Sequence, residues 1–311
     1  MKTPIIIGGQ KIGRLKASFL LFKEAWRFLK ADKELLLVPV VSLVLSFVLF
    51  GIVTTAAVLF TGSPESLFNT NSGVAYGQYA YLFALYVISA FCLAIAQAVI
   101  VHIVYVRAHG GNATLGQGLV RAFSIWLPLL LWSLITGTVG IILRTISDRS
   151  EIIGKLVAGL LGAAWAVLTF FVVPVILLEK KSPVAAVATS TKLFKQTWGE
   201  TLVSNVTLGL VFMLAHLTVL ASFIGLMIYG ASTQNAFILI AAIIGVVLWL
   251  VVAILVQSAL EGILKTLLYI YAAENVVPEN FNRELLESML VRKGTAQPIV
   301  SPVTPLPNTS A

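Results

Sequence analysis

Long runs of apolar residues, separated by short polar segments, dominate the chain. The first run, Leu35 to Phe60, holds 26 residues without a charge. At about 1.5 Å rise per residue, a helix of that length crosses a bilayer core of about 30 Å. Five similar runs follow, which predicts an all-α membrane protein with six transmembrane helices. The expected spans are residues 35–60, 79–106, 125–146, 154–178, 202–230 and 236–260, the last continuing as a more amphipathic helix to residue 273.

Three of the polar segments that precede a span have a helical pattern of their own. Apolar residues recur at spacings of three and four over residues 15–29, 115–126 and 187–198, with polar or charged residues on the other faces. This pattern is typical of amphipathic helices that lie at a membrane interface. Thr114 and Ser182 are the candidate N-caps of the second and third helix. Each segment reaches a Trp close to a span, and we expect all three helices to lie along the cytoplasmic surface.

The order of short helix, span and span occurs three times and predicts a threefold internal repeat. The first and third short helices share the skeleton Ser-x-x-Leu-Phe-Lys-x-x-Trp, starting at Ser18 and Ser190. Convergence is the alternative, because Trp favours the interface in any membrane protein. The expected divisions are a cytoplasmic N-terminus with an interfacial amphipathic helix (1–34), a six-helix transmembrane domain (35–273), a cytoplasmic amphipathic helix (278–292) and a disordered tail (293–311).

Composition and charge agree with this architecture. Hydrophobic residues make up 59% of the 311 residues and charged ones 11%, against about 25% charged residues in a soluble domain. All but three of the 21 Lys and Arg residues fall on one side of the six expected spans, the exceptions being Arg144, Arg149 and Lys155. The positive-inside rule then places both termini in the cytoplasm of a cell-membrane protein. We expect the bilayer, its anionic headgroups and a protein partner, rather than nucleic acid, to be the binding partners.

No pattern of residues points to enzymatic chemistry. Phosphate-binding loops, nucleophile elbows, His-Glu-x-x-His motifs and paired carboxylates within a span are absent from the sequence. Cys92 is the only cysteine, and neither His102 nor His109 has two further candidate ligands nearby. We therefore expect no enzyme, no cofactor and no metal.

A few polar residues within the spans are candidate intramembrane contacts. His216 lies in the fifth expected span, with Asn205 a few turns earlier. An intramembrane His can serve as a proton relay or substrate contact, but a neutral imidazole bonded to a neighbouring helix is the favoured interpretation. Gln257, Glu261 and Lys265 stand four apart on one helical face, so Glu261 can pair with Lys265 and accept from Gln257. We expect this pair at the cytoplasmic edge.

Small residues mark the fourth expected span as the packing centre of the bundle. They recur every four positions in two parallel rows, which is the pattern that lets membrane helices approach closely. The rows are formed by Ala158, Gly159, Gly162, Ala163 and Ala166. Pro39 and Pro174 fall within apolar runs and predict kinks or local unwinding there.

Three stretches resemble a known family. They are Trp26 to Pro39, Gly159 to Val175 and Lys192 to Glu200, and together they look like the signature of an uncharacterised family of prokaryotic integral membrane proteins. The likeness covers about residues 14–280. More loosely, the arrangement resembles the membrane region of glycerophosphodiester phosphodiesterases, without their catalytic domain. The resemblance implies a helical membrane fold and no activity, and it brings no functional residues.

Two functions are consistent with these patterns. The first is a non-enzymatic membrane module that acts through lipids or protein partners, supported by basic amphipathic helices on the cytoplasmic side. The alternative is a transporter or channel for a small solute or lipid, supported by the repeat, Pro39, Pro174 and His216. A polar path lined by His216, Asn205 and Thr136 favours transport, whereas a midplane packed with Leu, Val and Ala favours the module.

Overall fold

The computed structural model describes residues 5–7, 10–12, 14–63, 75–198 and 207–274. The all-helical character predicted from the sequence is confirmed, apart from a small antiparallel hairpin of β1 (Ile5–Ile7) and β2 (Gln10–Ile12). The helices are α1 (Arg14–Ala31), the 3-10 helix η1 (Lys33–Leu36), α2 (Leu37–Thr61), α3 (Ala75–Ala108), α4 (Leu115–Phe123), α5 (Trp126–Asp148), α6 (Ile153–Leu168), α7 (Val172–Glu179), α8 (Pro183–Trp198), α9 (Thr207–Ser232) and α10 (Ala236–Glu274).

Five segments are long and apolar enough to cross a membrane. In α9, which corresponds to the expected span 202–230, the apolar part that can be assessed is His216–Ser232 and is shorter than a full span. The start of that expected span, the predicted helix 278–292 and the tail 293–311 lie outside the described residues. The five segments are Lys33–Thr61, Tyr79–Ala108, Trp126–Asp148, Ile153–Glu179 and Ala236–Glu274.

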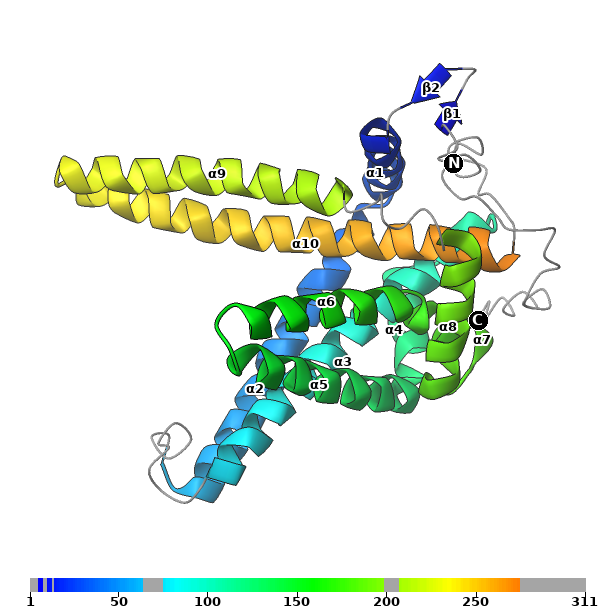
Figure 1. The fold of residues 1–311 in the computed structure, drawn as a ribbon, viewed down its shortest axis with the longest axis horizontal. Coiled ribbons are helices and arrows are strands. Elements are labelled where there is room, and N and C mark those ends of the chain that lie inside the picture. Colours follow the sequence, from blue (N-terminus) through cyan, green and yellow to red (C-terminus); the bar gives the residue numbers. More distant parts are fainter. Residues whose placement is uncertain (1–4, 8–9, 13, 64–74, 199–206, 275–311) are drawn as a thin grey trace.

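The long helices form three hairpins, each entered through a short helix (Figure 1). Helix α1 leads into α2–α3, α4 into α5–α6, and α8 into α9–α10. The exits of α3, α7 and α10 meet at the end of the hairpins where the short helices lie. We call this end the base, and it consists of α1, α4, α7 and α8 with the C-terminal halves of α3 and α10. The three hairpins extend away from it in different directions (Figure 1).

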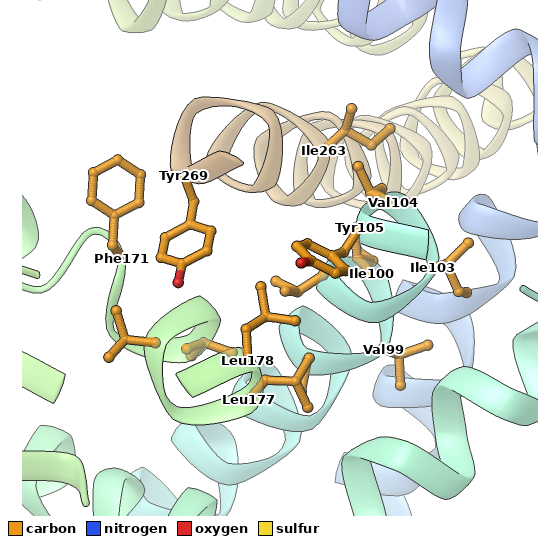
Figure 2. Packing of buried hydrophobic residues seen from close by; sticks show 14 of the residues in the cluster. Val99, Ile100, Ile103, Val104, Tyr105, Phe171, Leu177, Leu178, Ile263 and Tyr269 are labelled. Carbon is orange, nitrogen blue, oxygen red and sulfur yellow. The ribbon is translucent and has the colours of Figure 1, made fainter. Parts of the chain in front are cut away.

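The hydrophobic core lies in the base. It draws mainly on residues 94–105 of α3, 172–178 of α7 and 259–273 of α10. Figure 2 shows Tyr269 beside Phe171, with Leu178 and Ile100 on the other sides of the same cluster. The short helices close the core with Ala25 and Leu29 from α1, Ala122 from α4, and Ala186 and Leu193 from α8.

Apolar side chains away from the base are largely exposed. Phe47 of α2 is 67% exposed, and Leu248 and Ile254 of α10 are 60% and 64% exposed. A soluble monomer rarely presents so large an apolar surface. These outer halves therefore have the composition expected of helices that are solvated by lipid.

The prediction that the fourth span is the packing centre is wrong. A β-carbon placed on Gly159 of α6 meets no atom within 4 Å, and one on Gly162 meets only Leu143 of α5, at 3.6 Å. Gly159, Ala163 and Ala166 are exposed, and only Gly162 and Ala158 are half-buried. A row of small residues has the same spacing whether it faces a helix or lipid, so the pattern alone did not locate the centre.

Other glycines mark the close approaches between helices. A β-carbon on Gly262 of α10 would lie 2.9 Å from Ile100 Cγ2 of α3, and one on Gly118 of α4 would lie 2.9 Å from Val99 Cγ1. Both distances are shorter than real β-carbon contacts. Helix α3, packed between α4 and α10, is therefore the actual centre of the base.

The fourth expected span is broken in two. Helix α6 ends at Leu168 and α7 begins at Val172, with Pro174 as the third residue of α7. Proline cannot donate a backbone hydrogen bond and is tolerated in a first helical turn, where that donor has no intrahelical partner. The Phe171 amide at the break donates to the buried Ser190 hydroxyl of α8 at 2.9 Å. Pro39 occupies the same third position in α2.

The local signals for the short helices are largely correct. Thr114 caps α4 through a full capping box with Gln117, in which each side chain accepts from the other residue's backbone N–H. Helix α8 begins at Pro183, as predicted. However, α1 continues past Trp26 to Ala31, and Trp126 begins α5 instead of ending α4.

Candidate functional site

Two acidic residues lie where α7 and α10 meet in the base. Glu179 is the last residue of α7, and Glu274 is the last residue of α10 that the structure describes. A carboxylate at a helix C-terminus, such as Glu179, faces the negative end of the helix dipole and needs compensation. The Tyr269 hydroxyl donates to Glu179 Oε1 at 2.8 Å, and Lys181 Nζ lies 2.7 Å from Glu179 Oε2. The Glu179 side chain is only 3% exposed, and these two contacts offset the free-energy cost of burying its charge.

Glu274 is compensated by a histidine from the turn after α3. His109 Nε2 lies 2.9 Å from Glu274 Oε2, and His109 Nδ1 lies 2.8 Å from the Tyr105 carbonyl oxygen. Both partners accept hydrogen bonds, so the arrangement suits an imidazolium that donates from both nitrogens. The hydrogen bond with Glu274 raises the pKa of His109 above its usual 6.5, although burial opposes the rise.

A third ion pair joins α3 to the junction between α1 and η1. Arg107 Nη1 lies 2.5 Å from Asp32 Oδ2, and Arg107 Nη2 donates to the Ala113 carbonyl at 3.1 Å. Burial raises the pKa of the Asp32 carboxyl, while Arg107 acts in the opposite direction. Through these two contacts, Arg107 at the end of α3 holds both the residue that follows α1 and the turn that leads into α4. Arg121 of α4 makes a similar link, because its Nη2 donates to the Leu177 carbonyl of α7 at 3.0 Å.

A cavity of about 200 Å³ lies beside the base, between α3, α5, the α6–α7 break and α10. The rings of Trp132 and Trp165 stack along it, with centroids 5.9 Å apart and planes at 16°. Lys265 also lines it, with Nζ 5.5 Å from the Phe170 ring centroid. The cavity is lined by Ala90, Leu93, Ala94, Gln97, Trp132, Thr136, Trp165, Ala166, Thr169, Phe170, Val173 and Lys265.

The structure brings some of the predicted polar residues together and separates others. Lys265 Nζ lies 2.7 Å from Glu261 Oε1. Gln257 instead contacts His216, with 3.3 Å between its Oε1 and His216 Nε2, and His216 packs edge-on against Trp249. This contact joins α9 to α10 and lies apart from the cavity lining.

Of the remaining predicted residues, only two contribute to the cavity. Thr136 and Ala166 line it, whereas Ala158, Gly159, Gly162 and Ala163 do not. Asn205 lies outside the described residues.

The contacts of Glu179 and Glu274 in the base were not predicted from the sequence. One signal was available, because Glu179 and Glu274 are acidic residues that each follow a long apolar run directly. Their partners are distant in sequence, since Tyr269 is 90 residues from Glu179 and His109 is 165 residues from Glu274. Within the described residues, no group of three His, Cys, Asp or Glu side chains could hold a metal ion.

Comparison with known proteins assigns the chain to a family. The family of unknown function DUF6159 matches residues 75–277, which is more than half of the chain. The chain belongs to this family. No curated protein and no solved structure matches it. The expected membership of an uncharacterised family is confirmed, and the looser resemblance to glycerophosphodiester phosphodiesterases stays a prediction.

The DUF6159 match covers most of the candidate site. It extends from α3 to α10 and includes every residue that lines the cavity, together with Glu179, Glu274, Tyr269 and His109. It leaves out α1, η1 and α2, and also Asp32 between α1 and η1. The cavity and the contacts between α3, α7 and α10 thus belong to the part that the DUF6159 match defines.

Proposed function

We propose that this DUF6159 protein is a non-enzymatic integral membrane module whose base binds the anionic headgroups of the cytoplasmic leaflet. The observation that supports it is the concentration of basic side chains on the short helices of the base. Each cation close to an anionic surface contributes about 1 kcal/mol. Exposed cations on these helices or directly beside them are Lys23, Arg27, Lys30, Lys33, Lys180, Lys192 and Lys195.

The proposal includes a topology with six spans and both termini cytoplasmic. The opposite end of the hairpins carries Arg144, Arg149 and Lys155, and the turn between α9 and α10 has no Lys or Arg. This asymmetry supports a base that faces the cytoplasm. Helix α9 has 26 residues, which is long enough for the sixth crossing, and an even number of crossings returns the chain to the base.

Electron spin resonance of spin-labelled lipids around the full chain in vesicles tests the proposal. We expect phosphatidylglycerol to associate more strongly than phosphatidylcholine, with a preference that decreases with salt because exposed charges are screened. Replacing both Lys192 and Lys195 by Gln should weaken the preference. The matched control, Arg149→Gln with Lys155→Gln at the far turn, should leave it unchanged. Equal association of the two lipids, or equal effects of the two double variants, contradicts the proposal.

Transport of a lipid between leaflets is the second candidate, because the α6–α7 break lies beside the cavity. Interrupted helices often line substrate sites in transporters. The cavity includes Thr136 but not His216, so these residues do not form the polar path expected for transport. Proteoliposomes with a fluorescent lipid, bleached from outside, distinguish the two functions. Bleaching beyond the outer leaflet only when the protein is present supports transport, and protection of the inner leaflet supports the module.

A further inference from the structure

We infer that the cavity between α3, α5, the α6–α7 break and α10 binds the phosphate headgroup of one anionic phospholipid that enters from the bilayer. This inference rests on the proposed function and assigns a specific lipid site beside the base. It is carried by four features of the cavity: an enclosed cation, unused hydrogen-bonding capacity, an apolar mouth and a position close to the headgroup level.

The cation is more enclosed than its counterion. The Lys265 side chain is 16% exposed, whereas that of Glu261 is 55% exposed. An exposed carboxylate can turn into solvent at little cost, because exposed ion pairs contribute at most about 1 kcal/mol. Lys265 would then need a new anionic partner, and a phosphate oxygen in the cavity supplies one through a charge-assisted hydrogen bond.

The cavity wall offers further polar atoms. Among the described residues, the Gln97 amide has no hydrogen-bond partner, although it lies in the lining. The Thr136 and Thr169 hydroxyls donate to the carbonyls of Trp132 and Trp165, at 3.0 and 2.7 Å, which leaves their oxygens able to accept. These groups suit a ligand that has both a negative charge and hydroxyl donors, as a glycerol-based headgroup does.

The mouth of the cavity is apolar. Leu93 is 50% exposed and Ala166 is also exposed, and both belong to the lining. A site for a soluble anion is expected to have a charged rim that attracts the ion from water. An apolar rim on membrane-spanning helices instead admits a molecule that is already in the bilayer. The stacked Trp132 and Trp165 rings form an aromatic wall of the kind found at headgroup level.

Position and size select the headgroup rather than the whole lipid. Trp132 lies six residues into α5, which corresponds to about 9 Å along the helix. The site is thus within reach of the boundary between headgroups and acyl chains. A volume of about 200 Å³ equals that of six or seven water molecules at about 30 Å³ each. The acyl chains would remain in the bilayer.

Native mass spectrometry of the delipidated full chain in detergent, titrated with phosphatidylglycerol or phosphatidylcholine, tests the site. We expect saturable binding of one phosphatidylglycerol and at least tenfold weaker binding of phosphatidylcholine. Lys265→Gln should weaken phosphatidylglycerol binding about tenfold, whereas Lys155→Gln, at an exposed lysine of α6, should not. Ala166→Leu narrows the mouth from an exposed position and should weaken binding without loss of the folded state.

Each contrary outcome is informative. Unchanged affinity in both Lys265→Gln and Ala166→Leu, with thermal midpoints that show folded proteins, overturns the inference. Competition by millimolar inorganic phosphate as effective as that by phosphatidylglycerol identifies a soluble anion as the ligand and also overturns it. A failure of this lipid site can be told apart from a failure of the proposed function, because the two experiments measure different properties. The general preference for anionic lipid is expected to depend on Lys192 and Lys195, to decrease with salt and not to saturate at one lipid per chain.

Discussion

Replacing Gly262 by Ala tests the close approach of α10 to α3. The new β-carbon would lie 2.9 Å from Ile100 Cγ2 and 3.0 Å from Ile100 Cδ1. Ile100 is β-branched and only 1% exposed, so it has little room to move. Overpacking of this kind costs about 1–3 kcal/mol. Alanine also favours the helix over glycine by about 1 kcal/mol, and this gain partly offsets the cost.

The matched control is Gly159→Ala in α6. Both glycines lie within helices of membrane-spanning segments, so the gain in helix propensity is similar, but a β-carbon at Gly159 meets nothing within 4 Å. The two variants should therefore differ by the overpacking cost alone, about 1–3 kcal/mol. At about 2–4 °C per kcal/mol for a chain of this size, that is a difference of several degrees.

The assay is thermal unfolding of both purified variants in the same detergent, followed by intrinsic tryptophan fluorescence. We expect Gly262→Ala to unfold below the wild type and Gly159→Ala at or slightly above it. A midpoint for Gly262→Ala equal to or above that of Gly159→Ala would refute the close packing of α3 against α10. It would also remove the reason for placing the centre of the fold in the base.

Three further predictions concern the base. Tyr269→Phe removes the only hydroxyl that donates to Glu179 Oε1 among the described residues. This loss should destabilise the protein by about 1–3 kcal/mol in a denaturation series. Tyr79→Phe, at an exposed ring, is the control and should have almost no effect in the same series. Because the folded pKa of His109 is raised above 6.5, its contact with Glu274 stabilises fully below that pH and loses its effect as the pH rises through the raised pKa. The stability advantage of the wild type over His109→Gln should accordingly be larger at about pH 6 than at about pH 9, and an advantage independent of pH would contradict the ion pair. Thr114→Ala removes the capping box of α4 and should cost about 1 kcal/mol by calorimetry. Thr138→Ala should cost less, because the Thr138 hydroxyl donates to the Leu134 carbonyl within its own helix turn.

Local patterns predicted the helices well because their causes are local. The apolar runs gave the long helices within a few residues, and Thr114 and Pro183 marked the starts of α4 and α8. Helix–helix contacts were less accessible. Gly159 and Gly162 belong to rows of Gly and Ala, yet Gly262, which has Ser258 and Thr266 at the same spacing of four, makes the closer approach.

The candidate site was predictable only in part, for the same reason. The Glu261–Lys265 pair follows from a spacing of four along one helix. Its place beside a cavity depends on α3, α5 and α6, which no local pattern connects to α10. His216 shows the limit most clearly, because Gln257 was expected to bond within its own helix and instead contacts α9.

The arrangement of the base also has a consequence for biosynthesis. Its core needs Leu260, Ile263 and Tyr269, which are among the last parts of the described chain to leave the ribosome. Until then the faces of α3 and α7 that they cover have no partner, even though both earlier hairpins are already complete. A nascent chain that stops before α10 would thus hold two inserted hairpins without a finished centre. We therefore expect the insertion of α10 to complete the folded base, and chains truncated before α10 should be recognised by membrane quality control.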